Sequence, residues 1–263
     1  MSNVHGAMSK REVEAMQEHW GRGADGGRVL YHGTSFAALP HIAAAGLRPR
    51  DARGPSNWKR TIESNPETVY LTNSYALSFA ENAVGEGDEI EQPCAIIEVD
   101  CENASVLAHL HADEDAIEQA SRGRDHLPKG WGMVERTRYY RAITHRYPAL
   151  PSLAALGTCG HRGAISPGAI KRVAVITSAK ACELTFGGGI DPMITVLNYQ
   201  VVGSDYRAFL KWVFDGGEEP WIRPSMREFA KHFSLPLIER KGIVVFESIE
   251  NAVAAMRDAT PCW

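Results

Sequence analysis

The chain has 263 residues, of which 44% are hydrophobic and 23% are charged. This composition is typical of a globular protein and excludes a collagen-like, coiled-coil or disordered chain as a description of the whole. The length allows one large domain or one domain with an extension. The net charge is −4, from 28 basic and 32 acidic residues, and therefore provides no overall positive field that would attract nucleic acid.

Membrane and secretory signals are not evident in the sequence. No apolar run approaches the roughly 20 residues that a membrane-spanning helix needs. The first residues, MSNVHGAMSKREVEAM, contain no apolar segment of the kind found in signal peptides. The five cysteines are widely spaced and include no C-x-x-C pair, which favours reduced thiols over a zinc ribbon. We therefore expect a cytoplasmic protein that does not bind a membrane.

The expected elements begin, in chain order, with an N-terminal helix. Apolar residues at helical spacing predict this helix over 7–20, and a glycine-rich break follows at 21–27. Strands and helices then alternate as far as residue 101, separated by glycine, serine and proline signals. The expected elements are a strand at 28–33, a helix at 35–47 that Pro40 delays or kinks, a polar loop at 48–67, a strand at 68–72, a helix at 73–85 and a strand at 93–101.

The rest of the chain mixes strand and helix signals. We expect 106–122 to begin extended and end helical, 139–156 to mix helix and turn, and 163–177 to form strand, turn and strand. Beyond about residue 180 the expected strands are MITVLNYQVV and GIVVFES, and the expected helices are SDYRAFLKWVFDGG, PSMREFAKHF and ENAVAAMRDA. No regular strand–helix–strand rhythm connects these elements, which favours an α+β fold.

Three segments carry the functional signal. The first, LYHGTSFAALPHIAAAGLRPR at 30–50, places a His and a Gly at the end of a strand, before a helix and a Gly-Leu pair. The second, VYLTNSYALSFAENA at 69–83, places a Tyr on a strand before a helix bearing Ser78 and Phe79. The third, CAIIEVDCENASVLAH at 94–109, is a core strand leading to an apolar loop. A glycine at a strand end is weak evidence of function by itself, so the inference rests on the order and spacing of the three segments.

In this order the segments resemble the ADP-ribosyltransferase superfamily, on the poly(ADP-ribose) polymerase side with its His-Tyr-Glu signature. DNA-targeting ADP-ribosyltransferase toxins and RNA 2′-phosphotransferases share the layout, and a late Gly-x-Ile-Pro-Pro-type turn of the latter is similar to GAISP at 163–167. The resemblance covers about residues 28–178. It implies an α+β fold with a split, bent β-sheet core at 27–178, an N-terminal helix and linker at 1–26, and a small α/β extension at 179–263.

The resemblance implies that NAD is the substrate and that a set of residues holds it. His32 would donate a hydrogen bond to a ribose hydroxyl of NAD, and the backbone of Gly33 would pair with the nicotinamide carboxamide. Tyr70 would pack against the nicotinamide ring, Phe79 would close the sandwich and Ser78 would contact the amide. Further NAD contacts are expected from Thr34, Arg48 and Arg53.

The chemistry of the reaction explains why such residues are needed. Cleavage of the nicotinamide–ribose bond passes through an oxocarbenium-like state, and nicotinamide is a good leaving group. The protein therefore mainly holds the substrate and stabilises charge. Two aromatic faces suit a flat ring, because offset stacking favours ring centroids about 4.5–7 Å apart. A side chain at position 33 would block the approach of the ligand to the backbone, which is a reason for Gly33.

The sequence departs from the family at the third signature residue. The late strand that should carry Glu reads CGHRGAIS, so His161 or Arg162 stands near its place, and Arg162 is the candidate catalytic residue there. Three interpretations stay open: an acid from elsewhere, such as Glu135 or Asp113; Arg/His chemistry like that of the RNA 2′-phosphotransferases; or a ligand-binding module without catalysis. The missing Glu argues against polymer elongation. We expect an enzyme that transfers single ADP-ribose units to a macromolecule.

Local charge gives a hint about that macromolecule. Residues 120–146 contain seven basic and two acidic side chains, and 48–60 contain five basic and one acidic. Both stretches include aromatic residues, a combination that suits a nucleic-acid strand, although a solvated surface over core aromatics is an alternative. Nucleic acid is therefore favoured over protein as the acceptor. The HLHADED stretch at 109–115 offers metal-ligating side chains but no third His at a suitable spacing, so we expect no metal.

Overall fold

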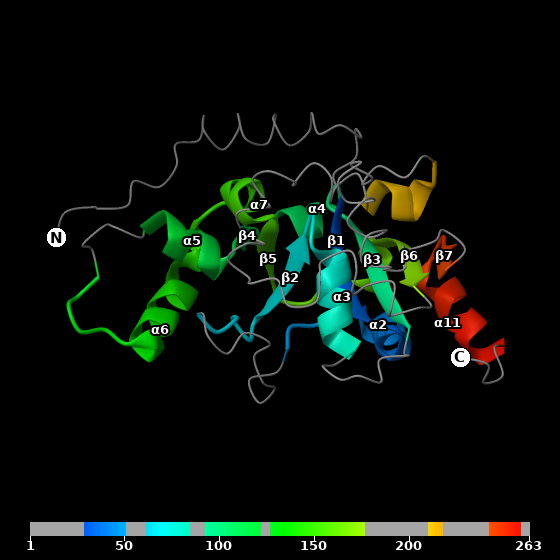
Figure 1. Cartoon of the computed structure of the whole chain (residues 1–263), viewed down its shortest axis with the longest axis horizontal. Helices are drawn as coiled ribbons and strands as arrows, with labels where there is room; N and C mark the ends of the chain where they lie inside the picture. Colours follow the sequence, from blue (N-terminus) through cyan, green and yellow to red (C-terminus); the bar gives the residue numbers. More distant parts are fainter. Residues whose placement is uncertain are drawn as a thin grey trace, which may run out of the picture. The chain divides into compact units, whose positions relative to one another are not determined.

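The computed structural model describes residues 29–50, 62–84, 93–121, 127–176, 210–217 and 242–258 (Figure 1). Within these residues, seven strands follow the hydrogen-bonded order β4-β5-β2-β1-β3-β6-β7, with β4 and β7 at the two open edges. The strands are β1 (Val29–Ser35), β2 (Thr68–Thr72), β3 (Cys94–Asp100), β4 (Leu110–Ala112), β5 (Thr158–Arg162), β6 (Ile170–Ile176) and β7 (Ile243–Phe246). The pairings β1–β2, β3–β6, β4–β5 and β6–β7 are antiparallel.

Short helices connect the strands. They are η1 (Phe36–Ala38), α2 (Leu39–Ala45), α3 (Ala76–Val84), α4 (Ala104–Leu107), α5 (Glu114–Ser121), α6 (Met133–Ile143), η2 (Thr144–Arg146), α7 (Ala149–Leu156), η3 (Pro167–Ala169) and α11 (Ile249–Asp258). Among the described helices, none has the length and apolar character that a bilayer crossing requires. The mixture of helices with an antiparallel sheet agrees with the expected α+β class, and the finer expectation of an ADP-ribosyltransferase-like core stays a prediction.

The contacts of the chain divide it into two compact units. The first unit comprises 1–29, 47–71 and 101–165, and the second comprises 30–46, 72–100 and 166–263. Strand β2 passes from the first unit into the second after Leu71. The expected domain boundaries after residues 26 and 178 stay predictions, and the helix expected over 7–20 lies outside the described residues.

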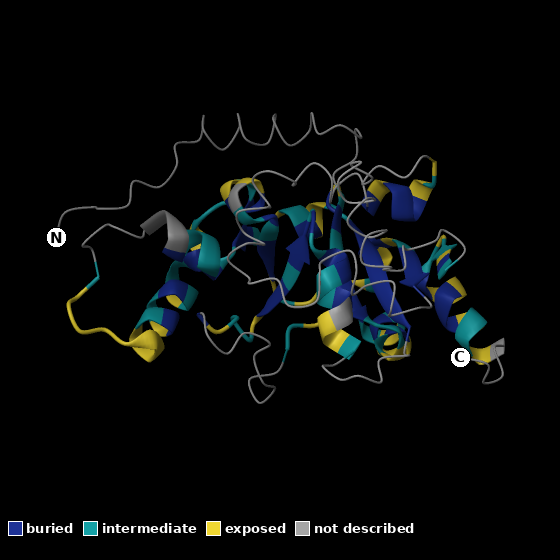
Figure 2. Cartoon of the chain, viewed as in Figure 1, coloured by how far each residue is buried: buried dark blue, intermediate teal, exposed yellow. Residues whose placement is uncertain are grey.

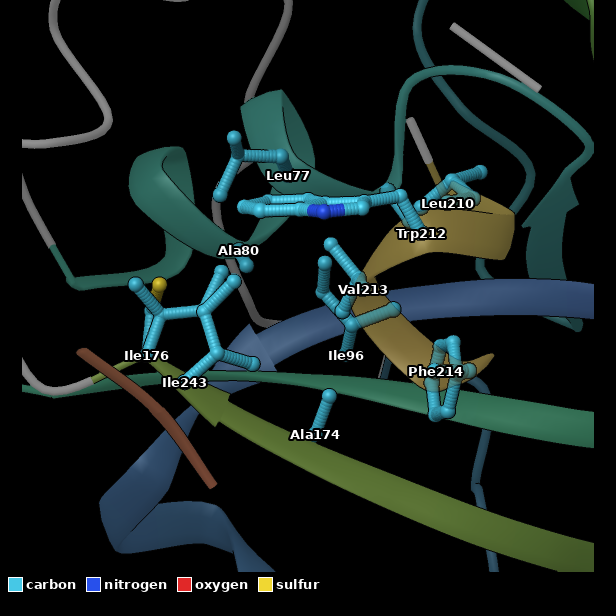
Figure 3. Packing of buried hydrophobic residues seen from close by; sticks show 12 residues of the cluster. Leu77, Ala80, Ile96, Ala174, Ile176, Leu210, Trp212, Val213, Phe214 and Ile243 are labelled. Carbon is cyan, nitrogen blue, oxygen red and sulfur yellow. The ribbon is translucent and has the colours of Figure 1, made fainter. Parts of the chain in front are cut away.

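The second unit is built around the buried strand β3. Six of its seven residues are buried, as the β-branched and apolar sequence CAIIEV predicts, and Ile96 lies opposite Ala174 of β6. Helix α3 covers this pair with Leu77 and Ala80, and the helical turn at 210–215 adds Trp212 to the same core (Figure 3). Strand β7 continues the sheet beyond β6, so described residues after 178 contribute to this core.

The first unit packs helices on the β4–β5 pair. Register places His111 opposite Gly160, and a Cβ atom on Gly160 would lie 2.3 Å from Cε1 of His111 and 2.7 Å from the methyl carbon of Thr68. Glycine is therefore required at this position if the His111 ring is to lie across β5. Helices α6 and α7 bury Tyr140 and Leu153, whereas the stretch at the start of α6 is exposed (Figure 2).

Several expected element boundaries are confirmed. The strand at 68–72 is β2, and the strand at 93–101 contains β3. The helix expected over 35–47 begins late, because a 3₁₀ turn precedes α2, Pro40 lies in the first turn of α2, and Gly46 ends it with φ 75°.

One expectation about element order is confirmed and one is wrong. In 106–122, strand β4 precedes helix α5 as expected, and only the end of the short helix α4, which Asn103 caps by accepting a hydrogen bond from the Ser105 backbone N–H at 3.0 Å, lies before them. The first strand expected in 163–177 lies earlier, at β5, and Ile165 forms only an isolated bridge with Leu47. Gly163, with φ 80°, directly follows the end of β5, whereas a strand was expected to begin at this residue.

Candidate functional site

The contact between β1 and α3 brings one group of the predicted site residues together in the second unit. Gly33 is buried, and a Cβ atom there would lie 2.0 Å from the carbonyl oxygen of Ala76 and 2.4 Å from the backbone nitrogen of Ala80. It would also lie 2.9 Å from the carbonyl carbon of Phe79. We expect a side chain at position 33 to block the ligand, and in the structure such a side chain would also clash with the backbone of α3. Helix α3 occupies that space, and only glycine allows so close an approach.

The side chains around this contact differ in burial. His32 is half-buried on β1, and Thr34 is buried one residue beyond Gly33. Ser78 and Phe79 are half-buried on α3, where the Phe79 ring lies 6.4 Å from that of Tyr75. Five of the eight residues predicted to contact NAD thus lie on this one pair of elements: His32, Gly33, Thr34, Ser78 and Phe79.

Tyr70 lies in the first unit, where its hydroxyl group is held by Glu114. The Tyr70 hydroxyl lies 2.7 Å from both carboxylate oxygens of Glu114 and donates its proton to them. The backbone N–H of Asn65 donates to the Tyr70 hydroxyl at 2.6 Å and to Oε1 of Glu114 at 3.1 Å. Burial raises the pKa of Tyr70, and the negative charges of Glu114 and Asp113 raise it further, so the phenol stays protonated. The ring is therefore anchored at its hydroxyl end.

Glu114 is the functional candidate that sequence reasoning missed. It is the first residue of α5 and is buried. Burial, and next the nearby Asp113 carboxyl, raise the pKa of Glu114 from its ordinary value of 4.5 to about 7. Burial also raises the pKa of Asp113. The HLHADED motif contains both Asp113 and Glu114. Tyr70 lies 44 positions before Glu114, so no local sequence pattern predicts the contact between Tyr70 and Glu114.

We expect the stability of the fold to depend on the protonation of Glu114. The unfolded chain loses this proton near pH 4.5 and the folded chain near pH 7, so the free energy of unfolding falls as pH rises through that window. The 2.5-unit difference corresponds to at most about 3 kcal/mol, at roughly 1.4 kcal/mol per unit. Glu114→Gln cannot ionise and should not show this fall. Its free energy of unfolding relative to that of the wild type should therefore rise as the pH increases from 4.5 to about 7.

Urea unfolding at a series of pH values measures this difference directly. Glu102→Gln, the same change at an exposed position of the first unit, should follow the wild-type curve. A constant gap between wild type and Glu114→Gln at all pH values would contradict the raised pKa of Glu114.

The structure separates the two candidates for the third signature position. His161 is buried, its Nδ1 lies 3.1 Å from the carbonyl oxygen of Gly163, and burial lowers its pKa. Arg162, the next residue, is exposed at the end of β5 and lines a cavity of about 200 Å³ in the first unit. Of the two, Arg162 is therefore the side chain that solvent and ligands can reach.

The alternative acids have structural partners. Glu135 is exposed at the start of α6, where its Oε2 accepts a hydrogen bond from the backbone N–H of Gly132 at 3.0 Å. Asp113 is half-buried, and its Oδ1 accepts from the backbone N–H of Asp115 at 3.0 Å. Each carboxylate thus stabilises the beginning of a helix.

The remaining predicted residues divide between described and undescribed parts. Arg48 is exposed after α2, and Arg53 lies outside the described residues. Within the described ranges, no three His, Cys, Asp or Glu side chains are grouped as a metal site. In the HLHADED stretch, His109 is exposed with its ring edge-on to that of His161 at 5.7 Å, and His111 is buried between strands.

Comparison with known proteins gave no relative. No protein-family model matches the chain, and neither a curated protein nor a solved structure is significantly similar to it.

Proposed function

We propose that the protein is an NAD-dependent mono-ADP-ribosyltransferase that modifies a macromolecule and releases nicotinamide. The observation that carries the proposal is the close contact of Gly33 with α3. The contact sets the strand-end His32–Gly33 pair against the helix that bears Ser78 and Phe79, which is the order of motifs that the resemblance to this superfamily rests on. The absence of a matching family leaves these residues as the basis of the proposal.

In the proposed reaction the bond between C1′ of the ribose and the nicotinamide nitrogen breaks, and the nitrogen keeps the electron pair. A nucleophilic atom of the acceptor then bonds to C1′ and loses its proton to solvent or to a base. His32 donates a hydrogen bond to a ribose hydroxyl, and the ring of Phe79 holds the nicotinamide by stacking. Positioning and charge stabilisation are the main contributions of the protein, because the leaving group is good.

Glu114 does not replace the missing signature Glu in this proposal. Its carboxylate is buried and both of its oxygens accept from Tyr70, so it positions the Tyr70 ring and does not touch the substrate. A catalytic role for Arg162 and phosphate contacts by Arg48 and Arg53 stay predictions. Without the signature Glu, we propose transfer of single units only.

Nucleic acid is the acceptor that we favour. Trp131 is 36% exposed and lies edge-on to Tyr139 at 5.7 Å, which leaves an aromatic surface for base stacking. Arg138 and Arg146 are exposed nearby in the sequence and can contact phosphates. Arg136 is less available, because it forms an ion pair with Glu118.

His32→Ala should lower kcat/KM for nicotinamide release by about a hundredfold, since a positioned hydrogen-bond donor at the reacting sugar contributes on this scale. The assay incubates the protein with labelled NAD and with cell protein, DNA or RNA, and measures both released nicotinamide and label on the acceptor. His41→Ala, which removes an exposed His of α2 in the same unit, should leave both rates unchanged.

The same experiment separates the alternatives. Absence of nicotinamide release by the wild type with every acceptor, or equal rates for wild type and His32→Ala, would contradict the proposal. Tight NAD binding without turnover would favour a binding module. Loss of the phosphate from a 2′-phosphorylated RNA oligonucleotide would favour 2′-phosphotransferase chemistry.

A further inference from the structure

A cavity of about 200 Å³ lies in the first unit beside the end of β5, and we name it the Arg162 pocket. Its wall combines side chains from β2, β4, β5 and the α6–η2 stretch. The polar side chains that matter here are Thr68, His111, Arg141, His145, Arg162 and Glu67. Among the described residues that line the pocket, Glu67 is the one carboxylate, against the two arginines Arg141 and Arg162.

The two arginines are presented to the pocket differently. Arg162 is exposed, and no described carboxylate lies within ion-pair distance of it. Arg141 is fixed by the loop before β2: its Nε donates to the carbonyl of Glu63 at 2.9 Å, and its Nη2 donates to the carbonyl of Ser64 at 2.7 Å. Nη2 also lies 3.1 Å from the exposed carboxylate of Glu63. These bonds orient the Arg141 guanidinium and leave Nη1 without a hydrogen-bond acceptor among the described residues.

His111 and Thr68 form the buried part of the wall. Nδ1 of His111 lies 2.8 Å from the carbonyl oxygen of Ala112 and is assigned as the donor, so Nε2 carries the lone pair, 3.4 Å from Oγ1 of Thr68. Burial lowers the pKa of His111, and the nearby His161, His145 and Arg162 lower it further. The neutral form of this ring is therefore favoured, and the positive charges of the pocket wall come from Arg141 and Arg162.

We propose that the Arg162 pocket binds a phosphate group, carried by a free nucleotide or by an oligonucleotide. Two guanidinium groups on separate elements offer donors from different directions, which suits the tetrahedral oxygens of a phosphate. A planar carboxylate, in contrast, needs only one guanidinium group, which can donate two parallel hydrogen bonds to its two oxygens. This site includes Arg162, the predicted catalytic residue, but phosphate binding there does not depend on NAD turnover.

Titration calorimetry of the full-length protein, without NAD, tests the proposal with inorganic phosphate, ADP and a short 5′-phosphorylated oligonucleotide as three separate probes. Arg162→Gln should weaken binding about tenfold or more, because a charge-assisted hydrogen bond is lost. Glu67→Gln should strengthen binding several-fold by removing the opposing charge. Arg257→Gln is the control, since it removes an exposed arginine that does not line the pocket and has no proposed binding role.

The outcomes are decisive in both directions. Tightest binding of ADP would identify a nucleotide as the source of the phosphate, and tightest binding of the oligonucleotide would identify nucleic acid. Absence of binding of all three probes would overturn the proposal, as would equal weakening by Arg162→Gln and Arg257→Gln, which would indicate surface charge alone. Urea unfolding of each variant shows that the fold is kept. Nicotinamide release is not a readout here, so failure of the proposed NAD activity leaves this test intact.

Discussion

Arg172→Leu is expected to lower the free energy of unfolding by about 3–5 kcal/mol. Arg172 of β6 forms an ion pair with Glu98 of β3, a side chain that is only 5% exposed, and its Nη2 donates to Oε1 of Glu98 at 3.1 Å. The same guanidinium donates to Asp215 at 2.7 Å and lies over the ring of Phe214, 5.0 Å from its centroid. Removal of Arg172 leaves the buried Glu98 carboxylate without its countercharge, which is the cause of the loss.

Matched variants isolate this cause in a urea-unfolding series. Lys171→Leu, the same kind of change at the exposed neighbouring residue of β6, should alter stability little. The double variant Arg172→Leu with Glu98→Leu should recover much of the stability, because a buried ion pair is often replaced by apolar side chains without loss. A double variant as unstable as Arg172→Leu alone would show that the uncompensated charge is not the cause.

Gly33→Ala is expected to lower the free energy of unfolding by about 3 kcal/mol or more, and to reduce the yield of folded protein. The new Cβ would lie 2.0 Å from the carbonyl oxygen of Ala76, which belongs to the backbone of α3 and cannot rotate away. The strand and the helix must separate to admit the methyl group, and this disturbs the packing of the second-unit core.

Gly168→Ala is the matched control for that variant. A Cβ atom at position 168 meets nothing closer than Oγ of Ser166 at 3.8 Å, and Gly168 has no positive φ, so alanine there should be neutral or slightly stabilising. Both variants are compared by thermal and urea unfolding. A Gly33→Ala protein as stable as Gly168→Ala would contradict the close packing of β1 on α3.

The parts of the fold that the sequence predicts are those with local signals. Strands β3 and β2 lie at the expected places. The β-branched run of β3 and the alternating residues of β2 favour strands by their local sequence alone. Pro40 and Gly46 mark the start and end of α2 by their own backbone restrictions. These features need no knowledge of the rest of the chain.

The contacts that define the candidate site are not local, and they are missed. Tyr70 and Glu114 are 44 residues apart, and no periodicity in the sequence relates them. The requirement for Gly33 comes from the backbone of α3, more than forty positions later in the chain. Arg162 and His161 could have been distinguished by the alternation of side chains along a strand, but β5 was not expected to begin at Thr158.

The most direct test of the proposed function is a crystal structure of the protein with a non-hydrolysable NAD analogue. We predict that the nicotinamide ring will be stacked by Phe79, that a ribose hydroxyl will accept a hydrogen bond from His32, and that the carboxamide will pair with the backbone of Gly33. An analogue that fails to bind at saturating concentration, or that binds without contact to His32 and Phe79, would contradict the proposed ADP-ribosyl transfer.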